Sequence, residues 1–327
     1  MVLTKRTLLA TALAAVTTAV STRTMAQAWP AKPIRLIVPL APGATADIIT
    51  RIYADELGKA LGQNIVVDNK TGAGGTIATA EAARAAPDGY TMLLISQGTV
   101  VFNMGLYPKP GYDPVKDFDS VAVAGSVSNI LVVHPDNPAK TVADVIAQAK
   151  AKPGEMTYSS GGTGTSHHMS ALLFERDVGV KMQHVPYRTT PAGIMGVVNG
   201  EVAMGFYNTP TVIGQIKGGK LKAIAITSEQ RSALFPELPT MVEQGVKGYV
   251  FNTWMGFAVP KGAPAPVVDK LNAELIRIAK LPSVREKMAN QGIDMMPAEP
   301  PAAVDKLVRD ELALWVPIIK ASGATAE

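Results

Sequence analysis

Glycine-rich turns that join an apolar strand to a helix recur along this chain, and they restrict its fold more than any other feature. The first apolar run, residues 34–39, leads into the turn PGATAD at residues 42–47. A segment with apolar side chains at helical spacing follows and ends at Gly62, as a helix C-cap would. A strand at 65–67, the turn TGAGGT at 71–76, a helical segment and a strand at 90–95 repeat this order. Such a repeat is typical of a parallel sheet with helices on its faces, so the sequence predicts an α/β fold.

A second set of elements follows an irregular stretch at residues 108–118, and the turn GGTGTS at 161–166 opens one of its helices. Its predicted strands lie at residues 130–134, 156–159, 202–206 and 221–227, and a further strand at 251–260 lies where the chain returns to the first half. The end of the chain is mostly helical and needs the first half to pack against. A chain of 327 residues can form two cores. We therefore expect two domains, residues 29–129 with 252–327 and residues 130–251, joined by two crossovers that act as a hinge.

Residues 1–28 have the three parts of a secretory signal peptide. Lys5 and Arg6 precede an apolar run of about 13 residues, and Ala26-Gln27-Ala28 fits the small-x-small cleavage rule. The run is shorter than the roughly 20 residues that span a bilayer. We expect cleavage after Ala26 or Ala28 and export to the periplasm.

Charge and cysteine content exclude several classes of function. Three of the 31 basic residues and none of the 27 acidic residues lie in residues 1–28, which leaves a net charge of +1. A nearly neutral body does not favour a nucleic-acid partner. The chain has no cysteine, which excludes disulfides, thiolate catalysis and thiolate metal sites.

The turns at residues 42–47, 71–76 and 161–166 share one chemistry. Each places small residues and free backbone N–H groups at the start of a helix, where the helix dipole favours an anion. In α/β sheets ligands bind beyond the carboxyl ends of the strands, where such turns gather. One turn from each half would grip a ligand from both sides. A turn of this kind can also serve only to reverse the chain, and Asp47 can simply complement the dipole.

Other site chemistries are poorly supported. The chain lacks a G-x-x-x-x-G-K-[ST] motif, a complete dinucleotide fingerprint, an H-E-x-x-H motif and a G-x-S-x-G elbow. Adjacent His167 and His168 point to different helix faces and cannot share a metal. His168 could donate to an anion or act as a cap or core residue, and Arg188 could pair with a carboxylate or stay solvated. We expect no metal, no cofactor and no catalysis.

Long segments of the chain resemble the Bug family, the periplasmic substrate-binding proteins of tripartite tricarboxylate transporters. They include IVPLAPGATADIITR, LGQNIVVDNKTGAGGTIATAEAARAAPDGYTMLL, YSSGGTGTSHH, HVPYR, GKLKAIAITSEQRSALFPELPT and WMGFAVPKGAP. The resemblance runs over essentially the whole mature chain, in order. It implies a two-domain periplasmic binding protein, a Venus flytrap with its ligand cleft between two Rossmann-like α/β domains. It also implies a small organic acid as ligand and the large and small membrane subunits of the transporter as partners. We expect a monomer.

The expected binding residues come from four segments. The first-domain turn supplies Gly43, Ala44, Thr45 and Asp47. The end of the third strand supplies Ser96, Gln97 and Thr99. The second domain supplies Ser160, Gly164, Thr165, His168, Tyr187 and Thr189. Trp254 is expected in the core rather than against the ligand.

Two departures from the family pattern bear on the ligand. Ala44 replaces the second glycine of the usual Pro-Gly-Gly-x-x-Asp turn, and Thr189 and Gly196 stand where the family usually has a glycine and an aspartate. Because a buried ammonium needs an acidic partner, the lost acid favours a dicarboxylate, aliphatic or aromatic, over an amino acid. Two alternatives stay open: a carboxylate-sensing module for a signalling partner, and a serine-dependent hydrolase using residues 159–168.

Overall fold

The computed structural model describes residues 29–297 and 299–326, and residues Lys32–Glu327 form one compact unit. The predicted signal peptide lies outside the described residues. The strands are β1 (Ile34–Val38), β2 (Ile65–Asn69), β3 (Thr91–Ser96), β4 (Phe118–Val133), β5 (Thr157–Ser160), β6 (Gln183–Pro186), β7 (Met204–Asn208), β8 (Lys222–Ile226) and β9 (Asn252–Pro260). The helices are α2 (Thr45–Leu61), α3 (Thr76–Ala83), α4 (Asn103–Leu106), α5 (Val142–Ala151), α6 (Ser166–Val178), α7 (Thr190–Val198), α8 (Thr209–Lys217), α9 (Ala265–Ala279), α10 (Pro282–Asn290) and α11 (Pro301–Ala321). Among the described residues, no helix has the length and apolar character that crossing a membrane requires.

The strands form one sheet in the order β2-β1-β3-β9-β4-β7-β5-β6, with β8 also paired to β4. The predicted parallel pairing holds for β1 with β2 and β3, and for β5 with β6 and β7. It is wrong for β9, which runs antiparallel to β3 and β4, and for β4, which runs antiparallel to β7 and β8. A parallel pair needs a crossover connection such as a helix. β3 and β4 both run antiparallel to β9 and therefore run in the same direction as each other, so β9 is the reversed strand between them. It pairs with strands far from it in the chain, so the local order of strands and helices does not determine its direction.

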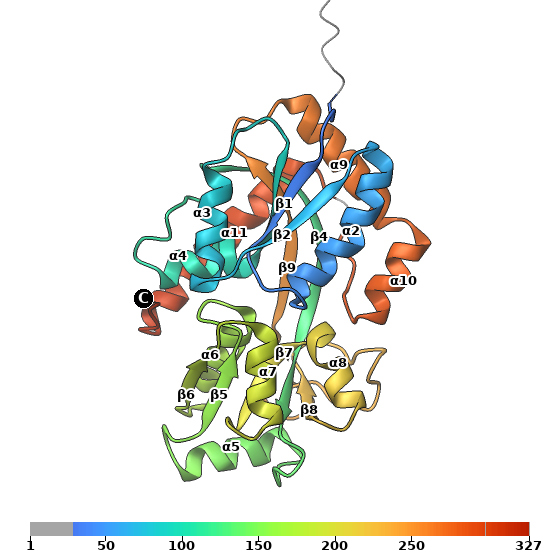
Figure 1. Cartoon of the computed structure of the whole chain (residues 1–327). Helices are drawn as coiled ribbons and strands as arrows, with labels where there is room; N and C mark the ends of the chain where they lie inside the picture. Colours follow the sequence, from blue (N-terminus) through green and yellow to red (C-terminus); the bar gives the residue numbers. More distant parts are fainter. Residues whose placement is uncertain (1–28, 298, 327) are drawn as a thin grey trace, which may run out of the picture. The chain divides into compact units, whose positions relative to one another are not determined.

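Strand β4 connects two groups of elements. Figure 1 shows it passing from an upper group, which contains β1, β2, β9, α2, α3 and α9–α11, to a lower group, which contains β5–β8 and α5–α8. We call these groups, with β3 and α4 in the upper one, the first and the second lobe. The pairing of β4 changes at Asn129: Ser128 pairs with Asn252 of β9, and Asn129 pairs with Asn208 of β7. The domain boundaries predicted beside these residues stay a prediction.

Sequence analysis predicted only the last part of β4. The strand begins at Phe118 rather than near residue 130, and its register shifts twice against β9, between Ser120 and Ala122 and between Val123 and Gly125. Small residues and bulges hide the two-residue period of a strand. Gly125 is required by close packing, because a Cβ there would lie 2.9 Å from the carbonyl oxygen of Asp294.

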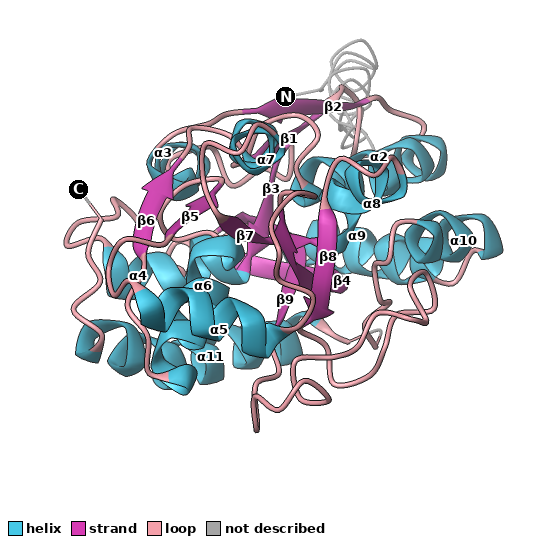
Figure 2. Cartoon of the chain, turned by 90° about the horizontal axis from the view of Figure 1, so that it is seen from below, coloured by secondary structure: helices cyan, strands magenta, loops and turns pink. Residues whose placement is uncertain are grey.

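Helices cover both sides of the sheet, as Figure 2 shows for α5, α6 and α11 on one side and α2, α7 and α8 on the other. The C-terminal helix α11 packs on the first lobe, as the sequence predicted. Its Trp315 ring lies 5.2 Å from the ring of Phe102 and 6.0 Å from that of Phe251, and Ile319 is buried beside it. Trp254 is buried in the same core cluster.

Candidate functional site

The turn between β1 and α2 is held by a side chain of its own helix. The amide of Gly43, at φ +79°, donates to the carboxylate of Asp47 (3.0 Å), and the Arg51 Nε donates to the same carboxylate (3.0 Å). Burial opposes ionisation of Asp47, but Arg51 and the Gly43 amide outweigh it and keep the pKa of the carboxyl below its ordinary value. Asp47 therefore fixes the shape of the turn. Ala44, the N-cap, has no side-chain oxygen and leaves the helix start uncapped by any side chain.

The turn between β5 and α6 is shaped by two histidines. The amide of Gly161 donates to Nδ1 of His167 (3.3 Å), and the amide of Gly164 donates to Nδ1 of His168 (3.4 Å). Thr165, the N-cap of α6, makes no side-chain cap hydrogen bond. The start of α6 is therefore uncapped by a side chain, like that of α2.

His168 lies behind this turn. Its ring stacks on His184 at 4.1 Å, and burial, together with His184, lowers the pKa of His168 to about 3. The ring is therefore neutral near pH 7. Its Nδ1 accepts a hydrogen bond from the loop, so the imidazole acts on the backbone of the turn.

A buried hydrogen-bond network joins the two lobes. Thr45 Oγ1 of α2 donates to Oδ1 of Asn208 at the end of β7 (3.2 Å), which also lies 3.3 Å from Nε2 of His167. The Asn208 amide nitrogen in turn donates to Oδ1 of Asn129, where β4 changes partners. Asn208 was missed by sequence analysis, although a polar residue after a buried strand and before Thr-Pro is a signal of a helix start.

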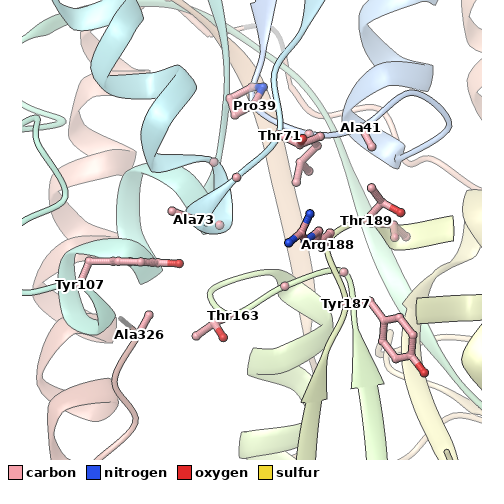
Figure 3. A pocket seen from close by; sticks show the side chains of 17 residues that line it. Pro39, Ala41, Thr71, Ala73, Tyr107, Thr163, Tyr187, Arg188, Thr189 and Ala326 are labelled. Carbon is pink, nitrogen blue, oxygen red and sulfur yellow. The ribbon is translucent and has the colours of Figure 1, made fainter. Parts of the chain in front are cut away.

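Two adjoining cavities lie between the lobes. The inner one has a volume of about 30 Å³ and is lined by residues of both helix starts. The outer one has a volume of about 440 Å³ and is lined by the loops around Pro39, Ala73, Gly162 and Arg188 (Figure 3). Leu40, Gly74 and Thr190 line both cavities. A Cβ at Gly74 would lie 2.5 Å from the carbonyl oxygen of Thr163, so glycine allows the two lobes to approach closely here.

The structure distributes the expected binding residues over three places. Those that line the inner cavity are Ala44, Thr45, Ser96, Thr99, Gly164 and Thr165. Those that line the outer cavity are Tyr187 and Thr189. Those that line neither cavity are Gly43, Asp47, Gln97, Ser160 and His168.

Two lining segments were not among the expected binding residues. The glycine-rich turn at residues 71–76 was singled out by its sequence, but its residues 71–75 were not among the expected contacts, and they form one wall of the outer cavity. Thr253 and Met255 of β9 line the inner cavity on either side of the buried Trp254. Both faces of β9 are buried, so its sequence does not indicate which of its residues face the cavity.

Ser160 and Gln97 contact other protein groups. Ser160 Oγ lies 2.7 Å from Nε2 of His184, a pair that resembles part of a hydrolase site, but Ser160 is buried outside both cavities. Gln97 donates through Nε2 to the carboxylate of Glu311 on α11 (2.5 Å). In the part of the chain that the structure describes, no three His, Cys, Asp or Glu side chains come together as a metal site would need.

Comparison with known proteins identifies the family. Residues 49–324 match the family described as "Tripartite tricarboxylate transporter family receptor". Protein BugT of Bordetella pertussis (strain Tohama I) is 34% identical over 300 residues, which cover 91% of this chain and 92% of BugT.

Solved structures show the same fold. The structure of R. palustris Rpa4515 with adipate is 31% identical, with a TM-score of 0.87 over 91% of this chain and 99% of that one. MatC (Rpa3494) from Rhodopseudomonas palustris with bound malate is 30% identical, with a TM-score of 0.84 over 89% and 100% of the two chains. The fold is thus the predicted two-domain α/β fold of periplasmic binding proteins, and the matching family is one of receptors rather than enzymes. Because the match spans most of its length, this chain belongs to the tripartite tricarboxylate transporter receptor family, which confirms the resemblance to the Bug proteins.

Proposed function

We propose that this protein captures a dicarboxylate, aliphatic or aromatic, in the periplasm and delivers it to the large and small membrane subunits of a tripartite tricarboxylate transporter. One observation carries the proposal: the starts of α2 and α6, from opposite lobes, line the same small cavity. Both starts lack a side-chain cap, and the positive ends of two helix dipoles favour an anion there.

The direct contacts we propose are the residues that line the inner cavity. Ala44 and Thr45 present the start of α2, and Gly164 and Thr165 present the start of α6. The inner cavity is about the size of one or two water molecules, which suits a carboxylate group held by backbone amides. The side chains of Asp47 and His168 support the two turns from behind.

The charge of the lining supports a diacid over an amino acid. Among the described residues that line the two cavities, none is acidic, so an ammonium group would find no carboxylate partner. Gly196, where the family usually has an aspartate, packs against the ring of Tyr187 outside both linings. The related structures bound to adipate and malate have diacids as ligands, which agrees with this choice.

Transport requires that the protein be exported and that its lobes open and close. We propose that residues 1–28 are removed as a signal peptide, that residues 29–129 with 252–327 and residues 130–251 form the domains, and that the hinge lies where β4 changes partners at Asn129. The hydrogen bond between Thr45 and Asn208 would then form only when the lobes meet.

A ligand screen on the chain from Trp29 tests the proposal. Thermal unfolding of this chain is measured with a chelator present and with one candidate ligand added at a time. The candidates are succinate, malate, adipate, terephthalate, aspartate and glutamate. A ligand at a hundred times its Kd stabilises the native state by about 2.7 kcal/mol, which raises Tm measurably. A rise with a diacid supports the proposal. Tight binding of aspartate or glutamate with no binding of plain diacids would refute the ligand class, and no shift with any carboxylate would refute carboxylate capture.

A further inference from the structure

The two cavities differ in size, and this difference places the ligand. The inner cavity, about 30 Å³, has room for little more than one carboxylate group, whereas the outer cavity is about 440 Å³. They adjoin through Leu40, Gly74 and Thr190. A ligand that has one carboxylate at the helix starts must therefore extend its remaining atoms into the outer cavity.

Arg188 supplies a charge to the outer cavity. The other lining residues that the structure describes are glycine, alanine, proline, leucine, threonine and tyrosine. Figure 3 shows the Arg188 guanidinium between Ala73, Thr163 and Thr189. An arginine in proteins is always charged, so this cavity carries a permanent positive charge.

The Arg188 side chain is exposed and free to bind a ligand. Among the described residues it has no ion-pair and no hydrogen-bond partner, in contrast to Arg35, Arg51 and Arg231, each of which pairs with a carboxylate. Its guanidinium has five N–H donors in a planar fork that matches a carboxylate.

The backbone on both sides of Arg188 is fixed. The amide of Tyr187 donates to the carbonyl oxygen of Ser160 (3.0 Å), and Thr189 Oγ1 accepts from the amide of Ala192 as the cap of α7 (3.3 Å). The Tyr187 ring turns away from the cavity, since its hydroxyl donates to Glu201 (3.0 Å). Two anchored neighbours therefore present the Arg188 side chain from a defined position in the loop.

We infer that Arg188 binds the second carboxylate of the ligand and thereby selects diacids over monoacids. This inference rests on the proposed function, because the first carboxylate must occupy the inner cavity. The guanidinium would also repel an ammonium group in the outer cavity, which adds to the selection against amino acids.

The test compares each diacid with a monoacid of the same carbon skeleton: adipate with hexanoate, succinate with butyrate, and terephthalate with 4-methylbenzoate. Binding is measured by calorimetry for the wild type, R188Q, R188K and K220Q. Lys220 is an exposed cation of the second lobe outside both cavities, so K220Q removes the same charge elsewhere. The Tm of each unliganded variant shows that it is folded.

We expect the wild type to prefer at least one diacid over its monoacid by about 10- to 100-fold, the value of one charge-assisted contact. R188Q should weaken only the diacid and reduce the preference to about threefold or less, R188K should keep part of it, and K220Q should keep all of it. A wild type that binds mono- and diacids equally, or an R188Q variant that keeps the preference, would overturn the role of Arg188 while leaving carboxylate capture standing. A wild type that binds no carboxylate would overturn both.

Discussion

Replacing Ala44 by aspartate should abolish ligand binding while leaving the fold intact. Ala44 is the N-cap of α2, has extended backbone angles (φ −73°, ψ 158°) and lines the inner cavity. Aspartate is a preferred N-cap residue in this conformation, and its carboxylate would accept from the free N–H groups of the helix start. The variant would thus carry, as a side chain, the anion that we expect the ligand to supply.

The expected effects on affinity and stability have opposite signs. Losing the charge-assisted hydrogen bonds of the ligand costs about 1.5–3 kcal/mol. Two like charges about 4 Å apart repel by about 4 kcal/mol at an effective dielectric constant of 20. Affinity should therefore fall at least about 100-fold, whereas the added cap changes the free energy of unfolding by up to about 1 kcal/mol in the stabilising direction.

Calorimetry for affinity and urea unfolding for stability measure the two effects. Ala44→Ser, which caps without charge, should lose affinity by about tenfold. Pro300→Asp, at the exposed N-cap of α11 outside both cavities, adds the same charge and should bind normally. If Ala44→Asp binds a diacid as tightly as the wild type, the start of α2 does not hold the ligand and the argument from helix starts is refuted.

Three further predictions concern the lobe contact, the sheet and acid stability. Thr45→Val removes the hydrogen-bond donor to Asn208 and should raise the ligand Kd about fivefold, chiefly through faster dissociation, which stopped-flow measurements detect. An unchanged Kd would argue against a hydrogen bond that forms when the lobes close. Gly256→Ala would place a Cβ 2.5 Å from the carbonyl oxygen of Ala122 and should lower the free energy of unfolding by about 2 kcal/mol or more. A urea unfolding midpoint equal to that of the wild type would contradict this. Burial, partly offset by the hydrogen bond to Asn208, lowers the pKa of His167 to about 4 in the folded protein. Below pH 6.5, the ordinary pKa of histidine, the unfolded chain therefore binds more protons than the folded one. The contribution of His167 to stability should be full above pH 6.5 and fall by on the order of 3 kcal/mol toward pH 4, and a His167→Gln variant with the same pH slope as the wild type would refute this source.

The start and end of α2 were predictable because local chemistry determines them. A helix was expected to follow the turn at residues 42–47 and begins at Thr45, and Gly62 ends it in the left-handed conformation (φ 67°) as expected. The buried strand before it also lies where its apolar run placed it. These features depend on residues close together in the chain, which a sequence pattern can represent.

Side-chain direction at the site could not be predicted, because it depends on partners far along the chain. Gln97 follows the third strand as expected, yet it points to Glu311, more than 200 residues away. The antiparallel insertion of β9 between β3 and β4 likewise joins segments that no local pattern relates. Sequence analysis therefore found the loops that surround the cavities, but it could not separate Ala44 and Thr45, which line a cavity, from Asp47, which supports the turn.

In the proposed site, backbone amides hold the first carboxylate and loop side chains contact the rest of the ligand, so one fold can bind different acids. The inner cavity offers helix starts whose amides exist whatever the side chains are, provided that the turns stay short, and Asp47 and His168 hold the turns in shape. Under the proposed function, recognition of a first carboxylate is therefore built into the fold. The outer cavity is lined by loops, where replacing a single residue, for example Arg188, would change the charge of the cavity without disturbing the sheet. Discrimination among acids should consequently reside in the loops around residues 71–75 and 187–190, and exchange of these loops between relatives that bind different acids should transfer ligand preference while carboxylate binding persists.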